Sequence, residues 1–249
     1  MKHIAILLFL VATTVFVAAQ NEWAQYNRYA AQNESISSRP KAVLMGNSIT
    51  DSWAKMHPEF FAENNLIGRG ISGQVTAQML SRFQADVVAL HPAKVVILAG
   101  ANDLAQNQGY ISHEHIMQNI QSMCELAKQH KIRPVLCSCL PAASFFWRPE
   151  LNASEDIARL NEMIKAYAKS NRIKYIDYYS VIKGYIFLHF IQSFQYPPTQ
   201  HSHRHIPKPR YELPPSIYPH SCRILLPNLV GCLGCPRSEN GSIHSIASI

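Results

Sequence analysis

Three short motifs in the sequence combine groups that could act together on an ester. In the first, the apolar residues 43–45 lead directly into Gly46-Asn47-Ser48, so a hydroxyl follows a predicted buried strand. A serine in such a turn can expose its Oγ, and the amides at the start of the next helix can stabilise negative charge beside it. The same serine could simply cap that helix, so this motif gains meaning only together with the other two.

The second motif places Gly68, Gly70 and Gly73 after the second predicted strand. Glycine tolerates positive φ and close backbone approach, so an amide in this turn can point into a site. The spacing G-x-G-x-x-G also resembles a dinucleotide-binding fingerprint, but the preceding strand is short and no acidic residue ends the following strand. We therefore interpret the turn as a source of backbone amides.

The third motif, Gly100-Ala101-Asn102-Asp103, follows the apolar run of residues 95–99. The Asn102 side chain can donate an N–H into a crevice, a role suited to an oxyanion hole. Asn-Asp after glycine is also typical of a turn that closes a strand. Together the three motifs supply a hydroxyl, a glycine amide and a carboxamide.

The elements around these motifs predict how they are positioned. Apolar strands alternate with amphipathic helices between residues 40 and 183, which is typical of βαβ units and a parallel sheet. The predicted strands are residues 41–45, 65–68, 94–99, 133–138 and 173–177, and the predicted helices are residues 76–90, 113–129 and 154–170. Right-handed crossovers then give a doubly wound α/β sheet, whose ligands bind outside the carboxyl ends of the strands. All three motifs are expected at that edge.

In this order and spacing, Gly-Asn-Ser-Ile-Thr, Gly-Ile-Ser-Gly-Gln and Gly-Ala-Asn-Asp resemble blocks I, II and III of the SGNH/GDSL hydrolases. The resemblance covers about residues 40–183. It implies a flavodoxin-like, three-layer α/β/α fold and ester hydrolysis that needs no metal or other cofactor. Asn47 replaces the Asp of the name-giving Gly-Asp-Ser-Leu motif, which leaves the nucleophile in place.

The resemblance also implies roles for individual residues. Ser48 would be the nucleophile, while the Ser48 and Gly73 backbone amides and the Asn102 side chain would form the oxyanion hole. Trp53 and residues 58–61 resemble the subgroup from gut bacteria that deacetylates sugars. Acetyl esters of carbohydrates are therefore the expected substrates, with lysophospholipids and short aliphatic esters as alternatives.

The family's fourth block, Asp-x-x-His, is absent after the last predicted strand. None of the six histidines beyond Asp177 has Asp or Glu three residues before it. A serine hydroxyl is a weak nucleophile until a histidine takes its proton, with an acid orienting the imidazole. His201, His203 and His205 could replace that base or could simply belong to a histidine-rich tail. The sequence thus predicts a nearly inactive esterase or, alternatively, a non-catalytic carbohydrate-binding protein of the same fold.

Residues 184–249 differ in composition from the predicted domain, residues 21–183. They contain nine of the fifteen prolines, six of the twelve histidines and no Asp. Proline at this density opposes helices and breaks sheet ladders, so we expect an irregular or disordered tail. The tail is either a genuine extension or the product of a reading-frame shift near Gly184. In both cases the final helix expected after Asp177 is missing, which would leave one flank of the last strand uncovered.

Cysteines and histidines raise a metal site as a further alternative. Only one Cys-x-x-Cys pair is present, without a second pair at matching distance, so zinc binding is not our main interpretation. The tail residues concerned are His201, His203, His205, Cys222, Cys232 and Cys235. Cys124, Cys137 and Cys139 are predicted core residues, and alternation along a strand makes the last two packed neighbours rather than a disulfide.

The first twenty residues are predicted to be a secretory signal peptide. A charged start is followed by the apolar residues 4–17 and by Ala18-Ala19-Gln20, a small-residue cleavage site. A retained anchor is the alternative, but a bilayer span needs about 20 apolar residues. We expect a secreted or periplasmic protein with no stable membrane span after cleavage.

The formal net charge of +7 is spread along the chain. Residues 21–183 hold 17 Lys and Arg against 14 Asp and Glu, and residues 184–249 hold 5 against 2. No basic stripe with interleaved aromatic residues is present, which argues against a nucleic-acid partner. The expected partner is a small-molecule or carbohydrate ester.

Overall fold

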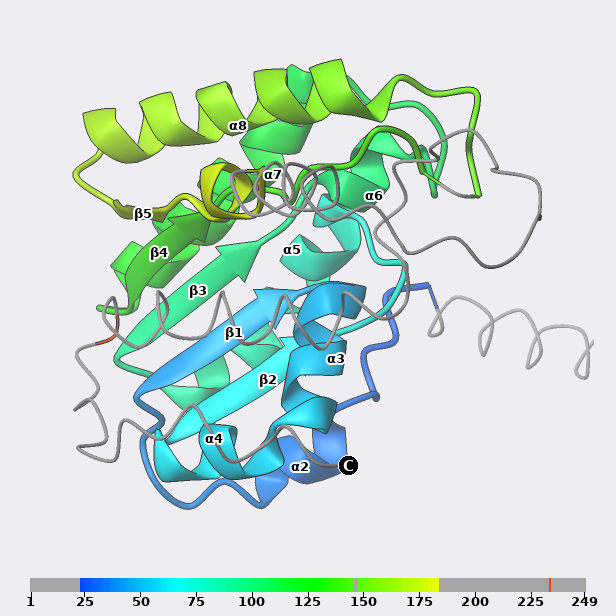
Figure 1. Cartoon of the computed structure of the whole chain (residues 1–249). Helices are drawn as coiled ribbons and strands as arrows, with labels where there is room; N and C mark the ends of the chain where they lie inside the picture. Colours follow the sequence, from blue (N-terminus) through cyan, green and yellow to red (C-terminus); the bar gives the residue numbers. More distant parts are fainter. Residues whose placement is uncertain (1–22, 146, 184–232, 234–249) are drawn as a thin grey trace, which may run out of the picture.

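The computed structural model of the chain describes residues 23–145, 147–183 and 233. Its centre is a sheet of five parallel strands in the order β2-β1-β3-β4-β5 (Figure 1). The strands are β1 (Ala42–Gly46), β2 (Leu66–Gly70), β3 (Lys94–Leu98), β4 (Arg133–Cys137) and β5 (Lys174–Ile176). The predicted doubly wound α/β fold is confirmed, and this is the flavodoxin-like strand order.

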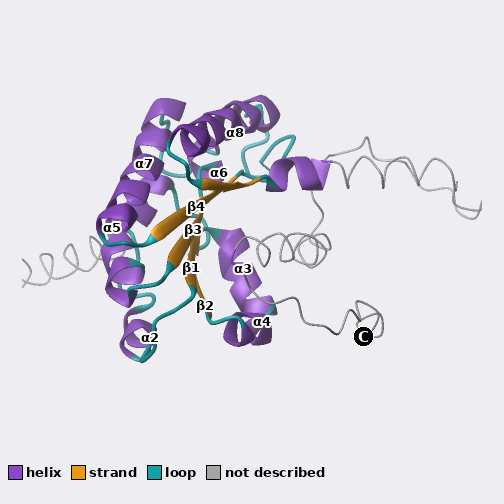
Figure 2. Ribbon diagram, turned by 90° about the vertical axis from the view of Figure 1, so that its left-hand side faces the viewer, coloured by secondary structure: helices purple, strands orange, loops and turns teal. Residues whose placement is uncertain are grey.

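Helices cover both faces of the sheet, giving three layers (Figure 2). Helices α5, α7 and α8 lie on one face, and α3 and α4 lie on the other. The helices are α2 (Ala30–Glu34), α3 (Ser48–Met56), α4 (Pro58–Glu63), α5 (Thr76–Asp86), α6 (Ala101–Leu104), α7 (His113–Gln129) and α8 (Ala153–Ser170), with a 3-10 turn η1 (Val88–Leu90) after α5. Most strand residues are apolar because helices cover both faces of the sheet, as parallel sheets require.

Each face of the sheet has its own core. Under α5, α7 and α8 lies a large cluster that includes Met79, Phe83 and Ile120. Under α3 and α4 lies a smaller cluster in which Trp53 packs edge-on against Tyr178, with ring centroids 5.8 Å apart. Trp53, which carries part of the resemblance to sugar deacetylases, is therefore a core residue.

Short elements and local bonds were harder to predict than the long ones. Helix α4 begins with Pro58, a position where the missing N–H costs nothing. At the start of α8, Asn152 and Glu155 have the spacing of a capping box, but the Asn152 side chain bonds the Glu155 side chain at 3.3 Å and caps no backbone group. Cys137 and Cys139 are both buried as predicted, but the prediction that they are packed neighbours is wrong, because β4 ends at Cys137 and the two lie in different clusters.

The chain after β5 takes part in the smaller core. Residues 178–183 are helical, and the Asp177 carboxylate caps them by accepting from Ser180 N at 3.0 Å and Ser180 Oγ at 2.9 Å. Tyr178, Ile182 and Leu233 are buried in that core, so they cover part of the flank expected to lie open. The Leu233 carbonyl also accepts from Lys94 Nζ at 3.0 Å.

The predicted signal peptide (residues 1–20) and the rest of the predicted tail (residues 184–249) lie outside the described residues. In the described part of the chain, no helix combines the length and apolar character needed to cross a bilayer.

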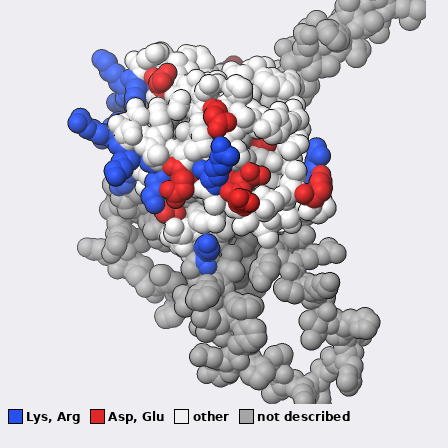
Figure 3. Space-filling model, turned by 90° about the horizontal axis from the view of Figure 1, so that it is seen from above, with Lys and Arg blue, Asp and Glu red and all other residues white. Residues whose placement is uncertain are grey.

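Viewed from the α8 side, acidic and basic side chains are interspersed over the surface, with several basic ones toward one edge (Figure 3).

Candidate active site

Ser48 lies where β1 ends and α3 begins. Asn47 is the N-cap, and its side-chain oxygen accepts from Ile49 N at 3.3 Å, which fixes the turn that presents Ser48. Ser48 is half-buried. The end of β2 packs closely against this turn, because a Cβ at Gly70 would lie 2.2 Å from Asp51 N. Only glycine at position 70 allows β2 to approach α3 so closely.

Gly73 lies in the turn between β2 and α5, with φ +80° and open space where a Cβ would be. This left-handed conformation favours glycine and allows the turn to present its amides. The Gly73 carbonyl accepts from Asn107 Nδ2 at 3.1 Å. The turn after β2 is thus tied to the loop that follows α6.

Asn102 belongs to α6, the single helical turn that follows β3. Its side chain is buried, and Nδ2 donates to the Gln74 carbonyl at 2.9 Å. A primary amide nitrogen carries two N–H groups, so this bond uses one and fixes the plane of the other. Blocks II and III are therefore joined through the side chain that was predicted to be an oxyanion donor.

Asp103 makes a second connection between the same two loops. Its two carboxylate oxygens each lie 3.0 Å from Thr76 N, and Oδ1 lies 2.5 Å from Thr76 Oγ1, at the first residue of α5. Burial raises the pKa of Asp103 to about 6, and the hydrogen bonds from Thr76 only partly oppose this. Asp103 of α6 therefore caps the start of α5, and its pKa lies well above the ordinary range of an aspartate.

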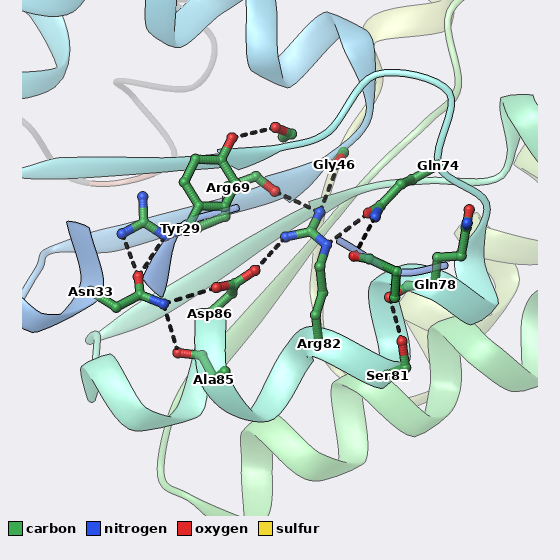
Figure 4. Close-up of polar contacts among 12 residues, drawn as sticks. Tyr29, Asn33, Gly46, Arg69, Gln74, Gln78, Ser81, Arg82, Ala85 and Asp86 are labelled. Atoms are coloured by element: carbon green, nitrogen blue, oxygen red, sulfur yellow. Dashed lines mark hydrogen bonds and ion pairs between the residues drawn. The ribbon is translucent and has the colours of Figure 1, made fainter. Parts of the chain in front are cut away.

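A buried polar network lies beneath the carboxyl ends of β1 and β2 (Figure 4). The Arg82 guanidinium, 1% exposed, donates to Gln74 Oε1 at 2.7 Å and to the Arg69 carbonyl at 2.9 Å. It also pairs with Asp86 at 2.8 Å and reaches the Gly46 carbonyl at 3.3 Å. Burial lowers the pKa of Arg82, and the hydrogen bond and charge of Asp86 oppose that change.

The outer side of this network leads to the N-terminal segment. Asn33 donates to Asp86 Oδ1 at 2.9 Å and accepts from Arg69 Nε at 3.0 Å. The Gln74 side chain also donates to the Ala24 carbonyl at 2.8 Å. The network therefore runs from α2 to Gly46 at the end of β1, one residue before Asn47, the N-cap of α3.

Ser48, Gly73 and Asn102 follow β1, β2 and β3, three adjacent strands of the sheet. Helix α3 leaves β1 on one face, whereas α6 and α7 leave β3 toward the other (Figure 2). The carboxyl ends of β1 and β3 thus form the topological switch point of the sheet, where ligands of such sheets bind. The structure places all three predicted residues at this edge, and their chemical roles remain predictions.

The other half of the edge, after β4 and β5, is also held by bonds between a side chain and the backbone of another segment. The buried Asn161 side chain accepts from Cys139 N at 2.7 Å and donates to Cys139 O at 3.0 Å. His201, His203 and His205, the alternative bases, lie outside the described residues. Within the described ranges, no group of three or more His, Cys, Asp or Glu residues could hold a metal ion.

Several residues that build the site were missed in the sequence. Arg82 and Asp86 form an i,i+4 charged pair on α5 beside the buried Met79 and Phe83, and such a pair on a core-facing helix signals a buried contact. Gln74 acts through its backbone carbonyl, which leaves no trace in residue type. Asn107 had no recognisable signal, because its contact with Gly73 joins residues 34 apart.

The chain matches a known protein family over most of its described residues. The model of the GDSL-like Lipase/Acylhydrolase family matches residues 44–199, more than half of the chain. The chain belongs to this family. The resemblance deduced from the three blocks is thereby confirmed, and the match includes the segments that carry Ser48, Gly73 and Asn102.

Solved structures with this fold include two from Bacteroides. A GDSL-like lipase from Bacteroides thetaiotaomicron is 49% identical, with TM-score 0.62, over 64% of this chain and 80% of its own. A proposed acylhydrolase from Bacteroides fragilis is 38% identical, with TM-score 0.68, over 85% of this chain and 98% of its own. Both likenesses agree with membership of the GDSL-like family.

A curated relative is more distant. The uncharacterized lipoprotein YqeF of Bacillus subtilis is 28% identical over 145 residues, which span 57% of this chain. The alignment covers 58% of the length of that relative.

Proposed function

We propose that the chain is an exported serine ester hydrolase in which Ser48 is the nucleophile. The observation that carries the proposal is the hydrogen bond from Asn102 Nδ2 to the Gln74 carbonyl at 2.9 Å. This bond holds the Asn102 carboxamide, a hydrogen-bond donor, against the turn that contains Gly73. The turn lies at the edge of the sheet where α3 begins with Ser48. Family membership supports acyl-ester chemistry at this edge.

The reaction divides into two steps. Ser48 Oγ bonds to the acyl carbon while its proton passes to a base, and the ester C–O bond breaks to release the alcohol. The Ser48 and Gly73 amides and the Asn102 N–H stabilise the negative charge on the carbonyl oxygen during this step. Water then attacks the acyl-serine, releasing the acid and restoring the hydroxyl. Without an Asp-x-x-His block the first proton passes to water, so turnover is slow.

Replacement of Ser48 by alanine tests the proposal. Ser48→Ala should abolish the turnover of 4-nitrophenyl acetate above the rate in buffer. Ser72→Ala is the matched control, since Ser72 is an exposed serine of the neighbouring turn and bonds Asp51 Oδ2 at 3.2 Å. Equal rates for Ser48→Ala and the wild type would overturn the proposal.

For the substrate, we favour acetyl esters of carbohydrates. Trp147 is 43% exposed, and its indole N–H donates to Asn107 Oδ1 at 2.8 Å, while Asn107 itself holds the Gly73 carbonyl. An indole ring with its N–H fixed offers a flat apolar face, and the amide of Asn107 beside it suits a polyhydroxylated leaving group. An acyl chain of a lipid would instead need aliphatic walls.

A ratio of two substrates tests this choice. Trp147→Ala should lower kcat/KM for an acetylated monosaccharide about tenfold more than for 4-nitrophenyl acetate, as expected for one lost stacking contact of about 1.4 kcal/mol. Trp23→Ala is the control, because Trp23 is a comparably exposed tryptophan on the N-terminal segment. Equal losses for both substrates would argue against a sugar.

A non-catalytic carbohydrate-binding protein is the second candidate. The observation that favours it is the absence of Asp or Glu three residues before any histidine beyond Asp177. Saturable binding of a sugar, measured by calorimetry, together with equal hydrolysis by wild type and Ser48→Ala would support this candidate.

Export is supported by the charged and apolar start of the chain and by the lipoprotein relative. N-terminal sequencing of the protein recovered outside the cytoplasm should begin at about residue 21, after the small-residue site. Recovery of only uncleaved cytoplasmic protein would contradict export.

A further inference from the structure

We infer that Arg82 is a positioning residue that fixes the turn of the oxyanion hole relative to the nucleophile. The inference rests on the proposed function. Arg82 lies on α5, and its guanidinium is fully buried beneath the carboxyl ends of β1 and β2. Its acceptors come from three separate segments that surround the site.

The contacts of Arg82 join the two halves of the catalytic arrangement. One nitrogen reaches both the Gly46 carbonyl, two residues before Ser48, and the Arg69 carbonyl of β2. Nε donates to Gln74 Oε1 at 2.7 Å, and the backbone carbonyl of the same Gln74 holds Asn102 Nδ2. A path of hydrogen bonds thus connects the strand of the nucleophile to the oxyanion donor.

Charge compensation alone does not account for this arrangement. Asp86 already neutralises the guanidinium at 2.8 Å, and it lies one helical turn from Arg82 on the same helix. Buried ion pairs add little net stability over well-packed apolar residues, so their presence favours a role in fixing conformation. The forked guanidinium can donate in several directions at once, whereas a lysine ammonium donates from a single point.

Because Asp86 neutralises the guanidinium, the effect of Arg82 on the site is positional: the buried fork holds the Gln74 side chain and the carbonyls of β1 and β2 in place.

The test compares variants on the inner and outer sides of the network. Arg82→Lys keeps the charge but loses the fork, and Gln74→Met removes the side-chain acceptor of Arg82. The control is Asn33→Ala, which removes contacts with Asp86 and Arg69 on the outer side of the network, away from Gln74, Gly46 and the three predicted site residues. All proteins are assayed well below their melting temperatures with 4-nitrophenyl acetate, and the Ser48→Ala rate is subtracted.

We expect Arg82→Lys and Gln74→Met to lower Ser48-dependent kcat about tenfold, with KM within about twofold, because a misplaced oxyanion donor acts on the transition state. Asn33→Ala should lower the melting temperature but leave kcat as in the wild type. An equal loss of kcat in Asn33→Ala, or an unchanged kcat in Arg82→Lys, would overturn the inference.

Hydrogen exchange keeps the inference testable if Ser48-dependent turnover is undetectable, which would be the failure of the proposed function itself. Mass spectrometry of full-length protein should then show faster exchange for residues 72–76 in Arg82→Lys than in Asn33→Ala. Equal exchange of this peptide in the two variants would show that Arg82 does not position the turn.

Discussion

Both halves of the carboxyl edge of the sheet are braced by bonds between segments, but all three predicted site residues belong to the first half. After β1, β2 and β3, side chains of one loop bind backbone groups of another, as Asn102 does with Gln74 and Asp103 does with Thr76. After β4 and β5, Ser138 Oγ accepts from Tyr179 N at 2.8 Å, and Asp177 caps the helical turn that follows. In the first half the bracing holds Asn102 against the turn of Gly73, whereas the segment expected to supply a base is a separate part of the sequence.

The largest expected effect comes from supplying the base. Replacing the residues after 183 by a segment that carries Asp-x-x-His at the family's spacing should raise kcat for 4-nitrophenyl acetate by about 10³-fold or more, because the histidine takes the Ser48 proton. The matched control carries alanine in place of that histidine. Equal kcat in this protein and the control would show that the first half cannot catalyse the reaction even when a histidine base is supplied.

Removal of the Asn102 amide should have the next largest effect. Asn102→Ala should lower Ser48-dependent kcat about 10²- to 10³-fold, as for other oxyanion donors, with KM little changed. Asn161 is an equally buried amide in the other half, where it holds both backbone groups of Cys139. Asn161→Ala should therefore cost stability and leave kcat intact, and parallel losses in the two variants would erase the distinction between the halves.

Asp103 should make the cross-bracing sensitive to pH. Its folded pKa of about 6 exceeds the ordinary value of 3.8, so the folded state binds the proton more tightly than the unfolded state does. This contribution, at most about 3 kcal/mol, is fully present below about pH 4 and is lost as pH rises through about 6. Melting temperature should fall between pH 4.5 and 7 in the wild type relative to Asp103→Asn. Parallel curves for the two proteins would contradict the prediction.

A cap in the other half should matter least. Asp177→Ala removes the acceptor of two bonds from Ser180 and should cost about 1 kcal/mol in the free energy of unfolding, measured by urea titration. Turnover should stay at the wild-type value, because the cap contacts no loop of the first half. A tenfold loss of kcat would place the turn after β5 within the catalytic arrangement.

Much of this architecture could be predicted from the sequence because it depends on period and order. The strands are short apolar runs and the long helices are amphipathic, so the sheet and the placement of Ser48, Gly73 and Asn102 follow from local patterns. The bracing could not be predicted, because it depends on backbone carbonyls of residues such as Gln74 and Gly46. Carbonyls are common to every residue type, and only the folded chain shows which ones face Arg82.

Covalent labelling of Ser48 tests the central claim most directly. Full-length protein is incubated with a fluorophosphonate and digested, and the peptide that contains residue 48 is examined by mass spectrometry. We expect a single phosphonyl adduct on Ser48, no adduct in Ser48→Ala and slower labelling in Asn102→Ala, because the oxyanion donor stabilises the same charge. Adducts spread over several serines, or equal labelling in Ser48→Ala, would contradict a nucleophile at this edge of the sheet.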